Sequence, residues 1–76
     1  MAPALDTEWA AMKTVAAMRY LAERYPECSG SAALYPHQDA AHDAAVAEDE
    51  GRFLEALRGY MRAGRDEVLR IRKEAA

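Results

Sequence analysis

The sequence predicts a small all-α protein, a three-helix domain, and three observations favour this fold class. The chain has 76 residues, which suits one domain. Eighteen of these residues are Ala, the strongest helix former, whereas β-branched residues are scarce. The C-terminal third then carries apolar residues at helical spacing. We therefore expect residues 1–76 to form a single helical domain.

The segment from 50 to 73 is the most strongly patterned part of the chain. At 100° per residue, eight of its residues fall within an arc of about 120°. They are Phe53, Leu54, Leu57, Tyr60, Met61, Gly64, Val68 and Ile71. Because such a helix is not stable alone, the rest of the chain must cover this apolar arc. Asp49 is the expected N-cap, and Gly64 within the arc predicts a close approach of another helix.

Another helix is predicted from 7 to 25. Asp6 has the side chain of an N-cap, and Pro26 ends the helix because the residue before a proline disfavours the α region. One side of this helix carries an apolar stripe, formed by Ala11, Val15, Met18, Ala22 and Tyr25. The stripe predicts the seam through which the 7–25 helix packs, in the antiparallel direction, against the 50–73 helix.

The middle of the chain is predicted to contain a loop and a short helix. Pro26, Gly30 and Pro36 interrupt residues 26–37, which favours an irregular connection. Residues 38–48 are rich in Ala and should form the short helix. An alternative stays open at Gly51, because Gly costs only about 1 kcal/mol inside a helix. The 38–48 and 50–73 helices could then be continuous, which would give a helical hairpin.

Four residues on the other side of the 7–25 helix are candidates for binding a partner. They are Trp9, Met12, Ala16 and Tyr20. Trp and Tyr are enriched at protein interfaces, and a helix that covers only one core needs neither on its outer side. The alternative is that another helix or the 26–37 loop covers them.

Charge is unevenly distributed along the chain, whose net charge is −3. Residues 1–50 hold three basic and nine acidic residues, and residues 51–76 hold seven basic and four acidic ones. The basic ridge of the 50–73 helix consists of Arg58, Arg62, Arg65, Arg72 and Lys73. This ridge suits a nucleic-acid-associated protein, although the acidic total opposes that alternative. An acidic inhibitor that mimics nucleic acid is a further alternative.

No residue pattern predicts a catalytic, metal or cofactor site. His37, Asp39, His42 and Asp43 form the one cluster that resembles a metal site. The two histidines are separated by about 140° around a helix, which is poor geometry for joint ligation, and no zinc pattern is present. Cys28 is the single cysteine, so it forms no intramolecular disulfide. We therefore expect a protein that is not an enzyme and binds no metal or cofactor.

The sequence also lacks the marks of secretion and of membrane insertion. No basic start with a long apolar run is present, and no stretch approaches the roughly 20 apolar residues that span a bilayer. A cytoplasmic protein without membrane contact is expected. The sequence favours a small protein–protein interaction module that acts as a homo-oligomer, most simply a dimer, or by docking on a larger partner through its helix faces.

Overall fold

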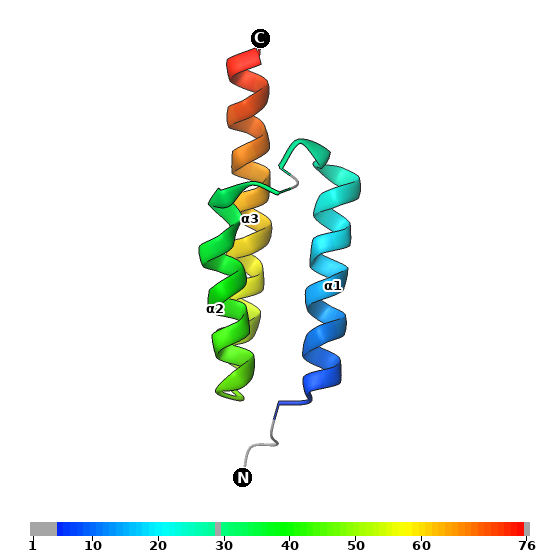
Figure 1. Cartoon of the computed structure of the whole chain (residues 1–76), viewed down its shortest axis with the longest axis vertical. Helices are drawn as coiled ribbons and strands as arrows, with labels where there is room; N and C mark the ends of the chain where they lie inside the picture. The colour runs from blue at the N-terminus through cyan, green and yellow to red at the C-terminus, as the bar shows by residue number, and fades with distance from the viewer. Residues whose placement is uncertain (1–4, 29, 76) are drawn as a thin grey trace.

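Three α-helices lie side by side in the computed structural model (Figure 1). The structure describes residues 5–28 and 30–75. In this part of the chain the helices are α1 (Thr7–Arg24), α2 (Tyr35–Val46) and α3 (Glu50–Ala75), and no strand is present. The prediction of an all-α, three-helix protein is therefore confirmed. The last turns of α3 extend beyond the other two helices (Figure 1).

The direction of α1 relative to α3 differs from the prediction. The rings of Trp9 and Phe53 lie 5.8 Å apart at the start of both helices, and Leu21 meets Gly64 further along. Contacts in the same order along both helices mean that α1 and α3 run parallel, as Figure 1 shows. The predicted antiparallel packing is wrong because α2 is a full neighbour of α3 and reverses the chain between the two longer helices.

Aspartate side chains cap the first turns of α1 and α3. Oδ1 of Asp6 accepts hydrogen bonds from the backbone N–H groups of Glu8 at 2.9 Å and Trp9 at 3.3 Å. Oδ1 of Asp49 accepts one from the N–H of Arg52 at 3.0 Å. Both predicted N-caps are confirmed, since each carboxylate satisfies N–H groups that have no partner within the helix.

The connection between α1 and α2 is more ordered than the predicted 26–37 loop. α1 ends at Arg24, and short 3₁₀ turns follow at Pro26–Cys28 and Ala32–Leu34. α2 then begins at Tyr35, three residues before the predicted start at 38. It can begin there because Pro36 falls in its first turn, where the missing proline N–H costs no hydrogen bond.

α2 and α3 are separate helices, so the continuous alternative is wrong. α2 ends at Val46, two residues before the predicted end at 48, and Glu48 takes a left-handed conformation with φ of 55°. The N–H of Asp49 donates to the carbonyl of Ala44 at 2.9 Å, which closes the turn. Asp49 then caps α3, so the chain reverses before Gly51.

The apolar arc of α3 forms the centre of the protein. All eight residues of the arc are buried or half-buried, and Phe53 and Val68 are almost completely enclosed. The close approach predicted at Gly64 is confirmed, since a Cβ atom there would lie 2.7 Å from Cδ1 of Leu21. α2 packs on a second side of α3, where a Cβ atom on Gly59 would lie 3.0 Å from Nδ1 of His37. Sequence periodicity missed that side because its residues are small.

α1 meets the core through a different stripe from the predicted seam. Its buried residues are Ala10, Ala17 and Leu21. The predicted seam is Ala11, Val15, Met18, Ala22 and Tyr25, of which the first four are exposed and Tyr25 is half-buried. The seam lies about a quarter turn from the buried stripe on a helix of 3.6 residues per turn. The seam prediction is wrong because apolar residues occur on several sides of α1, so their spacing does not single out the buried one.

Candidate functional site

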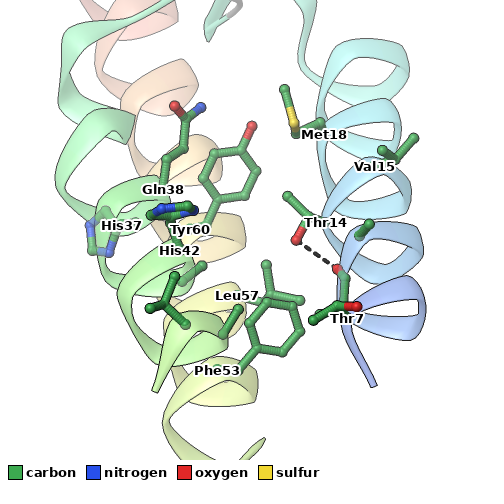
Figure 2. A pocket seen from close by; sticks show the side chains of 15 residues that line it. Thr7, Thr14, Val15, Met18, His37, Gln38, His42, Phe53, Leu57 and Tyr60 are labelled. Atoms are coloured by element: carbon green, nitrogen blue, oxygen red, sulfur yellow. Dashed lines mark hydrogen bonds between the residues drawn. The ribbon is translucent and has the colours of Figure 1, made fainter. Parts of the chain in front are cut away.

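An open apolar groove runs between α1 and α2, with α3 as its floor (Figure 2). Its volume is about 540 Å³. Phe53, Leu57 and Tyr60 rise from α3 into it, while Val15 and Met18 lie on the α1 wall. The remaining lining residues are Thr7, Ala10, Ala11, Thr14, His37, Gln38, Ala41, His42, Ala45 and Val46.

The groove exists because α1 and α2 both rest on α3 without closing on each other. Where the buried stripes of α1 and α2 border the groove, their side chains are mostly Ala, such as Ala10 and Ala41. No large side chain among the described residues there bridges the two walls. The larger apolar residues lie at the rim instead. Val15 is 51% exposed, Met18 47% and Val46 70%.

A second hollow extends the groove toward the α1–α2 connection. It shares Val15, Met18, Gln38 and Tyr60 with the first hollow, and Arg19 and Tyr35 stand at its edge. The two hollows together make one groove along most of α1. We call the surface formed by this groove and its two flanking helices the α1–α2 face.

Cys28 lies at the floor of the second hollow, where its thiol is enclosed. The side chain is 1% exposed, and its Sγ donates a hydrogen bond to the carbonyl of Tyr25 at 3.1 Å. Burial raises the pKa of the thiol above its ordinary value, and the nearby carboxylates of Glu27 and Glu67 act in the same direction. The thiolate that a nucleophile or metal ligand requires is therefore disfavoured.

The lining of the first hollow includes Thr, His, Gln and Tyr side chains but no Asp, Glu, Lys or Arg, and charged residues lie on the exposed surfaces of α1 and α2. The Thr14 hydroxyl is already used, because it donates to the carbonyl of Ala10 at 2.8 Å. Arg19 is exposed on α1, while Asp39 and Asp43 are exposed on α2. No Lys or Arg occurs between residues 26 and 51, so Asp39 and Asp43 have no Lys or Arg beside them on α2.

The four predicted partner-binding residues do not form a uniform surface. Trp9 is half-buried against Phe53, whereas Met12, Ala16 and Tyr20 are exposed. Cations of the same helix cover the two aromatic rings: Nζ of Lys13 lies 5.9 Å from the Trp9 ring centroid, and the guanidinium of Arg24 lies 6.0 Å from that of Tyr20. Contacts within the chain therefore already occupy part of the aromatic surface that a partner would bind.

The predicted basic ridge is interrupted by ion pairs. Arg58 contacts Glu55 at 3.1 Å and Arg65 contacts Asp66 at 3.5 Å. Arg72 reaches across to Glu27 at 2.6 Å, and thereby ties the start of the α1–α2 connection to α3. Carboxylates thus accompany three of the five ridge residues, the others being Arg62 and Lys73.

The possible metal-site cluster is dispersed. His37 packs over Gly59, and His42 lies on the α2 wall of the groove. Across residues 5–28 and 30–75, no group of three or more His, Cys, Asp or Glu side chains is arranged to hold a metal ion. None of the described helices is long and apolar enough to cross a membrane.

Comparison with known protein families finds no match, and comparisons with curated proteins and with solved structures find no similar chain at a significant level.

Sequence reasoning identified most of the α1 wall but assigned it to the wrong surface. The pattern predicts that the stripe through Ala11, Val15 and Met18 is core, yet it forms one side of the groove. The α2 wall was missed altogether. Val46 and Tyr35 are the only large apolar residues in the sequence of α2. Neither belongs to a long periodic pattern, so the sequence does not predict this wall.

Proposed function

We propose that this protein is a protein–protein interaction module whose α1–α2 face docks helical segments of another chain. The observation that carries this proposal is the exposure of Val15, Met18 and Val46 around a groove whose floor is the apolar arc of α3. Contiguous apolar surface rimmed by polar groups is typical of a docking site.

The shape of the groove favours a helix as the docking element. α1 spans 18 residues, so its wall is about 27 Å long at 1.5 Å per residue. Amphipathic helices bind in such grooves through apolar residues one turn apart, while their polar side remains in water. Added helices would complete a bundle of the four-helix type, in which each apolar stripe is covered by neighbours.

The other functions considered for the sequence have less support. Ion pairs at Arg58, Arg65 and Arg72 reduce the free positive charge that a nucleic-acid surface requires. A catalytic role would need an activated nucleophile or base, and Cys28 is enclosed with a raised pKa. We therefore propose no enzymatic activity and no cofactor.

Site-specific photocrosslinking in living cells tests the proposal. A benzophenone amino acid replaces Val46 at the groove rim, and in the matched control it replaces Leu69, which is 54% exposed on the free end of α3. We expect a discrete protein adduct from position 46 and little or none from position 69. Failure to obtain an adduct at position 46, or equal yields from both positions, would contradict a docking role for the α1–α2 face.

A further inference from the structure

We infer that the chain docked on the α1–α2 face is a second copy of this protein, related by a two-fold axis parallel to the helices. The inference rests on the proposed function and names the partner of the same surface. A rotation about such an axis keeps every residue at its own level along the bundle and brings α1 of each copy opposite α2 of the other. The opposed helices then run antiparallel, because α1 and α2 have opposite directions (Figure 1).

The size of the face is the first argument for a second copy. The molecule is 18 Å wide in the direction that separates α1 from α2. With a length of about 27 Å, the face has a flat footprint of about 500 Å² on each copy, or about 1,000 Å² in total. That total reaches the lower limit for a specific interface. A lone helix, about 10 Å across, would cover roughly half of this footprint.

Charge complementarity is the second argument. Arg19 lines the upper hollow together with Tyr35 and Gln38, so it lies at the level of Asp39, the residue after Gln38. In the two-fold arrangement, Arg19 of each copy therefore faces the partner's Asp39. The same pairing occurs twice, as an isologous interface requires. Between these charged rims, Val15 and Met18 of one copy meet the α2 wall of the other.

Sedimentation velocity on the purified protein tests the inference. The interface is near the lower size limit, so we expect a weak dimer whose formation is followed from about 1 µM to about 500 µM. Val46→Lys should shift the protein to monomer over this range, since a charge at the apolar rim opposes burial. Leu69→Lys is the matched control and should leave the dimer intact. Far-UV circular dichroism checks that both variants keep their helices.

A charge-exchange experiment then identifies which residues meet. Arg19→Asp and Asp39→Arg should each weaken the dimer by about tenfold, because each creates two like-charge contacts. An equimolar mixture of the two variants should recover the affinity, since every contact in the mixed dimer again joins opposite charges. Recovery on mixing requires that the contact is between chains.

The outcomes separate this inference from the proposed function. A wild-type protein that stays monomeric throughout overturns the second copy as partner, while a crosslink from position 46 to a different protein would leave the docking role in place. A dimer that persists in Val46→Lys, or mixed variants that do not recover affinity, places the dimer contact on another surface and also overturns the inference. Absence of any adduct from position 46 overturns the docking role itself.

Discussion

α3 and α1 are both amphipathic helices, yet the protein uses them differently. α3 is covered on two sides, by α1 and by α2, and every residue of its apolar arc is at least half-buried. α1 buries only a narrow stripe around Leu21, and leaves larger side chains such as Val15 and Met18 exposed. The difference teaches that apolar surface beyond what a helix needs for its own fold is the best guide to where another chain binds.

The largest expected effect is at Phe53, which is 1% exposed and contacts Trp9. Phe53→Ala should lower the free energy of unfolding by about 3–5 kcal/mol, because it removes a large buried side chain and leaves a cavity. Val15→Ala, the α1 counterpart at the groove rim, should change it by less than about 0.5 kcal/mol at concentrations where the protein is monomeric. Urea unfolding followed by circular dichroism measures both. Equal losses of unfolding free energy in the two variants would mean that Val15 stabilises the fold as much as Phe53 does.

The contact between Gly64 and Leu21 shows where α1 touches α3. Gly64→Val should destabilise the protein by about 2 kcal/mol or more, because its side chain would overlap the enclosed Leu21. In combination with Leu21→Ala, the loss should be smaller than the sum of the two single losses by about 1 kcal/mol or more. Gly51→Ala is the control, since its Cβ would meet only Oδ1 of Asp49 at 3.7 Å. Strict additivity at Gly64 and Leu21 would contradict the contact between α1 and α3 at these two residues.

The N-caps Asp6 and Asp49 allow α1 and α3 to be compared by the same substitution, aspartate to alanine. Asp49→Ala should cost about 1 kcal/mol of global stability, because α3 is the helix on which the others rest. Asp6→Ala removes bonds to Glu8 and Trp9, and should mainly increase amide hydrogen exchange in the first turn of α1. If Asp6→Ala lowered global stability as much as Asp49→Ala, α1 would be coupled to the core more tightly than its narrow buried stripe indicates.

The smallest expected effect concerns the ion pair that ties the α1–α2 connection to α3. The hydrogen bond from Arg72 lowers the pKa of Glu27 below its ordinary 4.5. The contribution of a carboxyl group with a lowered pKa is present above the unfolded-state pKa and is lost as pH falls through the folded-state value. Arg72→Met should therefore reduce stability slightly at neutral pH and not at all at a pH well below the lowered pKa of Glu27, where this carboxyl group is protonated. Thermal unfolding at both pH values measures the difference, which should shrink in high salt.

The comparison of α3 with α1 also shows how far the sequence could predict the structure. The α3 arc, the Asp6 and Asp49 caps and the close contact at Gly64 followed from local rules, because each depends on residues adjacent in the helix. The buried side of α1 did not, since it is chosen by where Gly64 leaves room for Leu21. The direction of α1 likewise depended on α2, whose small residues give a weak pattern. The groove was not predictable because it is a space between helices rather than a motif within one.

The central claim is that α1 presents its groove side to another chain, and cysteine accessibility tests it most directly. Val15 and Tyr20 are 51% and 44% exposed and lie about 140° apart around α1, while the native Cys28 is 1% exposed. Alkylation of Val15→Cys should slow when the protein is concentrated or placed in an extract of its own cells, relative to dilute purified protein. Alkylation of Tyr20→Cys should keep the same rate in all three conditions. Protection of position 20 with position 15 unaffected would contradict a docking role for the groove side, and would instead place the contact on the surface of Met12, Ala16 and Tyr20.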